Sequence, residues 1–345
     1  MSSLIGLVHG NEAYIEFEFR WDTLPVLLAA VPWIYMLPTL LLILRIHRVY
    51  LKSQNGKSDN LINRHLFRVL CWSQFTCYLF FVSDYLVIRL PATGLFTSWC
   101  ARSDPNHYLK AVFFSTFYLN YMAMLLPLLL SLVRLLIIFF PNSHSRVNEH
   151  LLRIALPLVL IYPLLFTFFL IPALGVCKTM AFPYPFGSVV IFYIDSLWEM
   201  HQSHLYLWNT LFWLFCSIAV NSLLLAKLIR VKGGIQKASR SAQSHKGELS
   251  LTVTTAAMVL FYVTNLGFGF AYVMYDMSSN YNSWATMFRP FGNDLETAVV
   301  PLVFYVTHPV FRREDPKFFG WFFGRRKSSA GQRIVKISPS SSGSF

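Results

Sequence analysis

The chain alternates between long apolar stretches and short polar segments. Seven stretches come close to the roughly 20 residues that an α-helix needs to cross the hydrocarbon core of a bilayer. They lie at residues 24–45, 66–90, 109–138, 151–174, 205–229, 250–275 and 289–308. This pattern predicts an all-α membrane protein, built as a seven-transmembrane helix bundle over residues 24–308. The seventh stretch differs from the others because it contains Asp294 and Glu296.

The segments outside the seven stretches have distinct characters. Residues 1–23 precede the first span, and residues 309–323 mix aromatic with basic side chains, which predicts a short amphipathic helix on the membrane surface. Residues 324–345 are small and polar and are predicted to form a disordered tail. The long segment 175–204 contains "SVVIFYI", which is typical of a strand and too short to cross a bilayer. We expect a hairpin or lid over the mouth of the bundle, with a partly re-entrant segment as the alternative.

Composition supports a membrane protein. Hydrophobic residues make up 55% of the chain and charged residues only 13%, whereas soluble domains carry about 25% charged residues. A net charge of +13 could indicate nucleic-acid binding. The basic residues, however, lie in short segments between apolar stretches, where they act as topology signals, so no nucleic-acid partner is predicted.

The basic residues also predict the orientation of the chain. If alternate segments are assigned to opposite sides, 23 of the 29 Lys and Arg residues fall on the side that holds the C-terminus. The positive-inside rule then predicts a multi-pass protein with an extracellular N-terminus and a cytoplasmic C-terminus.

Arg134 interrupts the apolar run "SLVRLLIIFFP" at the predicted cytoplasmic end of the third span. An arginine in hydrocarbon costs several kcal/mol, and more if it cannot reach water. One interpretation is that the side chain extends to the lipid headgroups. The other is that Arg134 forms a polar latch at the inner mouth of the helix bundle.

Seven spans, this orientation and this arginine resemble a G-protein-coupled receptor. In "VPLVFYVTHPVF", Pro301 and Phe304 resemble a degenerate N-P-x-x-Y motif, although Val300 replaces the Asn and Val133 replaces the acid that usually precedes the arginine. Together with "RPFGNDLETAVVP", these features make residues 20 to 320 resemble the nematode serpentine chemoreceptors, most of all serpentine receptor class gamma. The resemblance implies a sensory receptor in the plasma membrane of a chemosensory cell, with a heterotrimeric G protein and membrane lipids as partners. Arg134, Pro301 and Phe304 would then belong to the inner switch.

Several polar residues inside the spans are candidates for ligand contact. Hydrogen bonding between helices is the simpler interpretation, and binding of a small, apolar or weakly polar molecule in an outer pocket is the alternative. Asp294 and Glu296 project about 200° apart on a helix, so they are not expected to share one partner. The candidates are Asp84, Asn120, Tyr121, Asn265, Asn293 and Asp294.

Cys100 and Cys177 both fall on the predicted extracellular side, where thiols oxidise. A bridge between them would tether the second extracellular loop to the top of the third span, and similar receptors carry a bridge that joins these regions. The alternative is two unpaired thiols. No Cys or His spacing suggests a zinc site, so no metal and no cofactor are expected.

Two other classes of function fit the sequence less well than a receptor. A seven-span ligand-gated channel subunit or transporter is the main alternative. The lack of a repeated, acid-lined half argues against a transporter. The basic excess on the inner side argues against the reversed topology of those invertebrate odorant receptors that are channels. No nucleophile–base pair, intramembrane metal motif or Gly-rich phosphate loop is present in a convincing context, so the chain is not predicted to be an enzyme.

Overall fold

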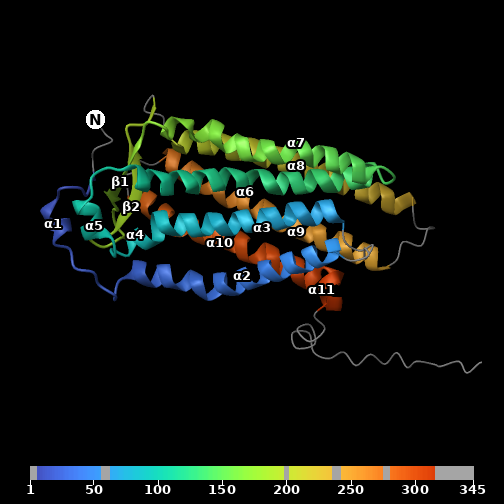
Figure 1. The fold of residues 1–345 in the computed structure, drawn as a ribbon, viewed down its shortest axis with the longest axis horizontal. Coiled ribbons are helices and arrows are strands. Elements are labelled where there is room, and N and C mark those ends of the chain that lie inside the picture. Colours follow the sequence, from blue (N-terminus) through green and yellow to red (C-terminus); the bar gives the residue numbers. More distant parts are fainter. Residues whose placement is uncertain (1–5, 56–62, 198–201, 235–241, 275–279, 315–345) are drawn as a thin grey trace, which may run out of the picture.

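The computed structural model describes residues 6–55, 63–197, 202–234, 242–274 and 280–314. Its long helices run side by side along the longest axis of the molecule (Figure 1). They are α2 (Leu24–Asn55), α3 (Arg64–Asp84), α6 (His107–Phe139), α7 (His144–Thr167), α8 (Gln202–Gly234), α9 (Ala242–Met274) and α10 (Asn280–Thr307). Six membrane-spanning candidates by length and hydropathy lie in α2, α3 with the short elements after it, α6, α7, α8 and α9. The predicted helical membrane bundle is therefore confirmed.

The seventh long helix, α10, is less apolar because it carries Arg289, Asp294 and Glu296. It nevertheless lies within the bundle, where it packs against α9, α2 and α3. All three of these ionisable side chains are buried. Their burial means that α10 depends on its neighbours, rather than on lipid, to accommodate its polar groups.

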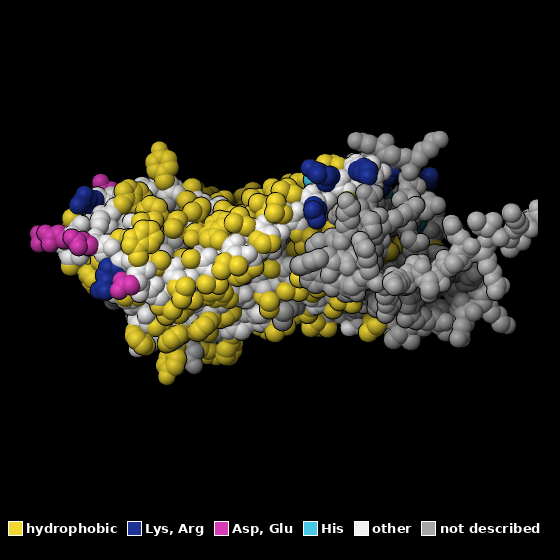
Figure 2. Space-filling model, turned by 90° about the horizontal axis from the view of Figure 1, so that it is seen from below, with side chains coloured by type: hydrophobic (Ala, Val, Ile, Leu, Met, Phe, Trp, Pro, Cys, Tyr) yellow, Lys and Arg dark blue, Asp and Glu magenta, His cyan; other side chains and the backbone are white. Residues whose placement is uncertain are grey.

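Large apolar side chains are exposed along the helices at the periphery of the bundle. Ile34 on α2, Leu165 on α7 and Phe215 on α8 are all more than 60% exposed. On the face shown in Figure 2, hydrophobic side chains cover the middle of the molecule, and the visible Asp and Glu side chains lie at one end. Soluble monomers rarely expose apolar surface on this scale. We therefore assign the exposed apolar side chains of α2, α7 and α8 to contact with lipid.

The core is centred on α6, which packs against α3, α7 and α8. At the end of the bundle near α11 (Pro309–Glu314), buried rings of α3, α10 and α11 form one cluster. The ring centres of Phe67 and Phe304 are 5.2 Å apart, and those of Phe304 and Phe311 are 5.5 Å apart. We call this end the α11 end.

The opposite end, which we call the hairpin end, carries an antiparallel hairpin of β1 (Leu174–Thr179) and β2 (Val189–Ile194). The predicted strand in residues 188–194 is confirmed, and it forms the expected hairpin. The short elements α1 (Glu12–Ile15), α4 (Leu90–Ala92) and α5 (Thr97–Arg102) lie at the same end (Figure 1).

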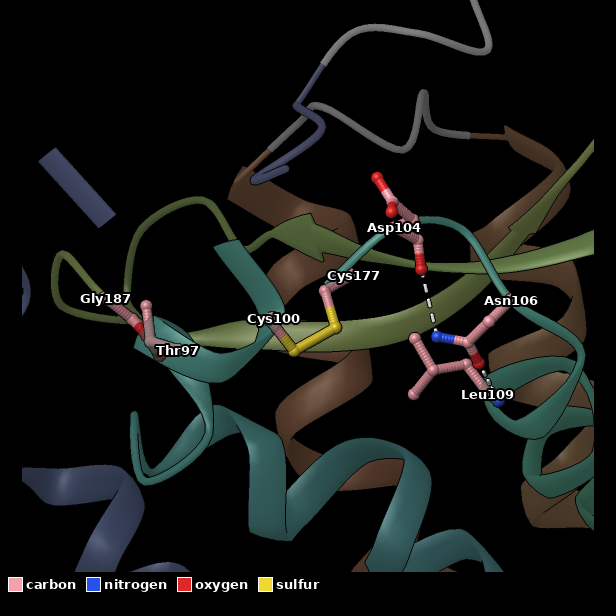
Figure 3. The surroundings of a disulfide bond; sticks show 7 residues. All are labelled: Thr97, Cys100, Asp104, Asn106, Leu109, Cys177 and Gly187. Carbon is pink, nitrogen blue, oxygen red and sulfur yellow. Dashed lines mark hydrogen bonds between the residues drawn. A yellow bond between two sulfur atoms is a disulfide. The ribbon is translucent and has the colours of Figure 1, made fainter. Parts of the chain in front are cut away.

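The hairpin is fixed to α5 and to the start of α6 by three kinds of contact. A disulfide joins Cys177 on β1 to Cys100 on α5, with the two Cα atoms 5.8 Å apart (Figure 3). The backbone groups of Gly175 and Asn106 exchange two hydrogen bonds of 3.0 Å. Thr97 also donates a hydrogen bond to the carbonyl oxygen of Gly187, in the turn between the strands. These contacts hold β1 against the bundle.

Gly175 is required for this close approach. A Cβ atom at this position would lie 2.1 Å from the amide nitrogen of Lys110 and 2.5 Å from the carbonyl carbon of Leu109. Both atoms belong to the backbone of α6 and cannot move aside as a side chain would. Glycine therefore permits the strand to contact the helix directly.

Some predicted boundaries differ from the structure. Helix α7 ends at Thr167, and the fourth candidate span, which includes the short helix η3 (Phe168–Leu170), ends at Leu170 and not at residue 174. Pro172 lacks the N–H that a continuing helix would need. The first span extends to Asn55, ten residues beyond the prediction. Of the predicted surface helix at 309–323, α11 covers the first six residues. The remainder and the predicted tail at 324–345 lie outside the described residues.

Candidate functional site

Two buried ion pairs cross between neighbouring helices at the hairpin end. Arg89 donates to Asp294 over 2.6 Å, and Arg289 donates to Asp84 over 2.7 Å. Each of the four side chains is at most 10% exposed. Asp84 is the last residue of α3, and Arg89 lies five residues further along the same continuous helical segment. Their partners, Arg289 and Asp294, both lie on α10. The pairs therefore clamp α10 to this part of the bundle.

A widened helical turn carries Arg89 into this position. Residues Tyr85–Arg89 form the π-helical segment η2, immediately before α4. Pro91 in α4 has no N–H to donate to the carbonyl of Val87, so a regular α-helix cannot continue through this point. Segments of this kind occur often at functional positions.

A third helix joins the ion pairs through Tyr35 on α2, whose hydroxyl donates to the carboxylate of Asp294. Arg89 also lies over the ring of Phe291, with 4.9 Å from the guanidinium carbon to the ring centre. One guanidinium nitrogen of Arg89, Nη1, is buried without a hydrogen-bond partner. We call Tyr35, Asp84, Arg89, Arg289 and Asp294 the charge cluster. With two acids and two bases it has no net charge.

A small cavity of about 20 Å³ adjoins the charge cluster. Arg89 is its one charged lining residue, and Tyr184 from the turn of the hairpin forms part of its wall. The other lining residues are mainly apolar: Pro25, Leu28, Ala29, Ile88, Ala92, Thr286, Met287, Pro290 and Phe291. Its volume is close to what a single water molecule needs, so it is a small gap beside a placed donor and not a preformed pocket for an organic ligand.

The other predicted ligand residues divide between this region and a second polar group. Asn293 lies next to Asp294 on α10, and its side-chain nitrogen is buried without a hydrogen-bond partner. In the second group, Tyr206 on α8 donates to Asn265 on α9, and its ring lies 6.4 Å from that of Tyr121 on α6. Asn120 is buried, with its side-chain oxygen lacking a hydrogen-bond partner. The described contacts therefore place Asp84, Asn293 and Asp294 in one group and Tyr121 and Asn265 in another, and they assign Asn120 to neither.

Arg134 lies at the α11 end and is only 4% exposed. It does not extend to the surface. Its guanidinium donates to the carbonyl oxygen of Leu251 over 2.9 Å and to the hydroxyls of Thr255 and Thr252 over 2.7 and 2.8 Å. All three acceptors lie on α9, so Arg134 links the third helix of the bundle to the sixth.

The two other predicted switch residues belong to the aromatic cluster at this end. Pro301 lies inside α10. Phe304 is fully buried, and its ring packs against those of Phe67, His308 and Phe311. This packing connects the end of α10 to both α3 and α11.

Three contributions to these sites were missed by the sequence analysis. Arg89 and Arg289 were counted among the charges of the extracellular side, although both are buried within the bundle. Tyr35 was not singled out. The sequence offers one local signal for the two arginines. Arg89 lies five residues after Asp84, and Arg289 lies five residues before Asp294, in each case within or beside an apolar stretch.

The hairpin carries a further charged group, Lys178, opposite Val190 on β2. Its ammonium lies 4.4 Å from the centre of the Phe192 ring. Partial burial lowers the pKa of Lys178 below its usual value, because the charged form loses contact with water.

Comparison with known proteins agrees with the helical membrane bundle. A family model described as serpentine type 7TM GPCR chemoreceptor Sru matches residues 8–314. Serpentine receptor class U-26 of Caenorhabditis elegans is 39% identical over 264 residues, which cover 76% of this chain and 90% of that protein. Both matches are to class U, so the predicted membership of class gamma is wrong. The motifs around Pro301 indicated a serpentine receptor but do not separate one class from another.

Proposed function

The chain belongs to the serpentine type 7TM GPCR chemoreceptor Sru family, and from this premise we propose that it binds a small ligand at the hairpin end and activates a heterotrimeric G protein at the α11 end. In this proposal the receptor lies in the plasma membrane of a chemosensory cell. The hairpin is extracellular, and α11 and the tail are cytoplasmic.

Two independent observations support this orientation. The cysteines of the disulfide lie at the hairpin end, and such bonds persist in oxidising, extracellular surroundings. Most Lys and Arg residues fall in segments that connect to the opposite end, as the positive-inside rule requires of a cytoplasmic side.

We propose the cavity beside the charge cluster as the place where the ligand first contacts the helices. Its lining is mainly apolar, and the neighbouring charges already balance one another. A highly charged ligand would bring an uncompensated charge into this region. A small apolar or weakly polar molecule would not, and it could contact Asp294 or Arg89 through a single polar group.

The observation that carries the signalling proposal is the link between Arg134 and α9. Three hydrogen bonds from one buried guanidinium hold the inner ends of α6 and α9 together. We infer that this packing is the closed state, and that a G protein binds when α9 moves away. A ligand shifts this balance only if it binds one packing more tightly than the other.

Replacing both Thr252 and Thr255 with Val tests this inference. The change removes two of the three acceptors of Arg134 while keeping side-chain size. Hydrogen bonds to charged groups contribute about 1.5–3 kcal/mol each. The freed guanidinium can bond to other groups, so we work with the lower value for a single bond, about 1.5 kcal/mol. If the closed state predominates, this loss would raise basal nucleotide exchange on a co-purified G protein about tenfold.

Thr254→Val is the matched control. Thr254 is buried on the same helix, but its hydroxyl donates to the carbonyl oxygen of Ser250 and does not contact Arg134. Its basal exchange should equal that of the unsubstituted receptor. Equal exchange in the double variant and the control, at equal surface delivery, would exclude the latch.

An N-terminal tag stained on intact cells measures delivery and tests the orientation at the same time. A tag that is reached only after permeabilisation would contradict the receptor topology. Ion conductance through a channel with the reversed orientation would then be the next quantity to record.

A further inference from the structure

The hairpin is one layer of a larger cap on the hairpin end. Leu7 of the N-terminal segment pairs with Lys178 on β1 in antiparallel fashion. The backbone N–H of Val8 donates to the carbonyl oxygen of Cys177 over 3.2 Å, and Val8 is fully buried. The N-terminal segment therefore continues the sheet beyond β1. Figure 1 shows this segment, with α1, at the same end of the molecule as the hairpin.

The N-terminal segment is also fastened to the turn of the hairpin and to α5. The ring of Phe17 fills the space beside Gly187, where a Cβ atom would lie 2.0 Å from it. The carbonyl oxygen of Phe17 accepts from the hydroxyl of Ser98 over 2.9 Å. Tyr184 of the same turn is buried and forms part of the wall of the cavity beside Arg89. A ligand that arrives from water along the axis of the bundle would have to break contacts of this cap.

The helical walls of the same cavity reach the lipid-facing surface. Leu28 on α2 and Phe291 on α10 both line the cavity, and both are partly exposed. Leu27 and Phe288, which lie beside them on the outer faces of the two helices, are 59% and 53% exposed. We call the contact between α2 and α10 at Leu28 and Phe291 the seam. Its surroundings are apolar, so a lipid-soluble molecule can approach it from the bilayer.

Arg89 supplies the polar group behind the seam. Its Nη2 donates to Asp294, whereas its Nη1 is buried without a hydrogen-bond partner among the described residues. Tyr35 also lies beside Arg89, but its hydroxyl donates to Asp294. A buried donor without an acceptor is unfavourable, so this position selects an acceptor. The cavity of about 20 Å³ has room for little more than one such group, which leaves the body of a ligand in the seam.

We propose that the ligand enters from the bilayer through the seam and places one hydrogen-bond acceptor, such as a carbonyl oxygen, against Nη1 of Arg89. This inference rests on the ligand-binding function proposed above and narrows the class of ligand. The ligand partitions into lipid, is uncharged, and carries its acceptor at the edge of an apolar body. The bilayer concentrates such molecules beside the receptor, because their apolar surface leaves water.

The test uses benzophenone, an apolar ketone that partitions into lipid. Under near-ultraviolet light its carbonyl carbon bonds to neighbouring C–H groups, so the labelled residues report where the carbonyl lies. The purified receptor is labelled in nanodiscs of diether phospholipids, which carry no competing carbonyl, and the products are mapped by mass spectrometry. We expect saturable labelling of Met287, which lines the cavity and is 5% exposed. A benzophenone glucoside, which stays in water, should instead label Phe182 of the hairpin, which is 65% exposed.

Two variants test the donor and the seam separately. Arg89→Lys keeps a positive charge opposite Asp294 but removes the second guanidinium nitrogen. Labelling of Met287 at low benzophenone concentration should fall about tenfold, as expected for the loss of one hydrogen bond to a charged group. Leu28→Trp fills the seam and should reduce the labelling by a similar factor. Leu27→Trp is the matched control, since it makes the same change at the neighbouring residue, which does not line the cavity, and it should label normally.

The possible failures are distinguishable. Equal labelling of Met287 by benzophenone and by the glucoside would overturn entry through lipid but leave a ligand site at the hairpin end. Undiminished labelling in Arg89→Lys would overturn the acceptor contact, and equal labelling in Leu28→Trp and Leu27→Trp would overturn the seam. Absence of label at Met287 with both probes would overturn this inference together with the cavity as the first point of contact. The measurement needs no G protein, so none of these results bears on the signalling proposal.

Discussion

Asp294→Asn isolates the contribution of charge to the crossed ion pairs. Asparagine has nearly the same shape as aspartate and keeps an oxygen that can accept from Tyr35. What the variant lacks is the negative charge opposite Arg89. The result is a guanidinium buried to 6% exposure whose ionic partner is gone.

The magnitude follows from the geometry. At 2.6 Å and an effective dielectric constant of about 20, the attraction between unit charges is about 6 kcal/mol. Desolvation of the two groups offsets much of this attraction, so the pair adds little net stability. Removing one partner, however, leaves the desolvation cost of the other uncompensated, which destabilises by about 3–5 kcal/mol. Folded proteins have only about 5–15 kcal/mol in total.

The assay uses the buried thiols of Cys71 and Cys77, in a background where the partly exposed Cys216 is replaced by Ser so that it cannot react before unfolding. A maleimide dye reports unfolding when it gains access to them, and the Cys100–Cys177 disulfide does not react. We expect Asp294→Asn and Arg89→Gln each to lower the unfolding midpoint strongly. The double variant should be more stable than either single variant, because neither charge is left alone.

Two results would refute this reasoning. One is a midpoint of Asp294→Asn equal to that of Glu149→Gln, whose exposed pair with Arg153 should contribute no more than about 0.5 kcal/mol. The other is a double variant whose loss equals the sum of the two single losses, since additive effects mean that the residues do not interact.

Three further predictions concern the hairpin. Gly175→Ala should prevent folding and surface delivery, since its methyl would lie 2.1 Å from the backbone nitrogen of Lys110. Gly267→Ala is the control and should be delivered normally, because the added methyl would meet no neighbouring atom within 4 Å. Cys177→Ser should lower stability by about 4.5 kcal/mol, the chain-entropy value for a 77-residue separation, and a reductant should have no further effect on this variant. Lys178→Met should be more stable at neutral pH. In the unsubstituted protein, the free energy of unfolding should increase as pH rises from the lowered pKa of folded Lys178 toward 10.5, because over this range the unfolded state binds the proton and the folded state has released it. The variant should lack this increase, and unfolding measured over a series of pH values tests this.

The sequence was sufficient to predict the helices, their number and the hairpin. Bilayer thickness sets the length of a spanning stretch, so apolar runs identify spans without knowledge of tertiary contacts. The β-branched run at 188–194 identified a strand for a similarly local reason. The end of the fourth span was wrong because the apolar run continues past Thr167, although the helix does not.

The partners of the buried charges could not be predicted. Asp84 and Arg89 lie five residues apart on one segment, as do Arg289 and Asp294 on another, so pairing within a segment and pairing across helices fit the sequence equally well. Which occurs depends on the rotation of α10 about its axis, and hydropathy does not fix that rotation. Glu296 illustrates the same limit, since its burial becomes visible only once α3 and α9 are in place beside α10.

The charges of α10 have a consequence for biosynthesis. A helix with Arg289, Asp294 and Glu296 partitions poorly into lipid by itself, and α10 follows every other long helix that the structure describes. By the time the ribosome releases it, Tyr35, Asp84 and Arg89 are already in the membrane. Insertion of α10 thus becomes conditional on correct assembly of the preceding helices, and a receptor misassembled at α2 or α3 would leave its last long helix exposed to cellular quality control.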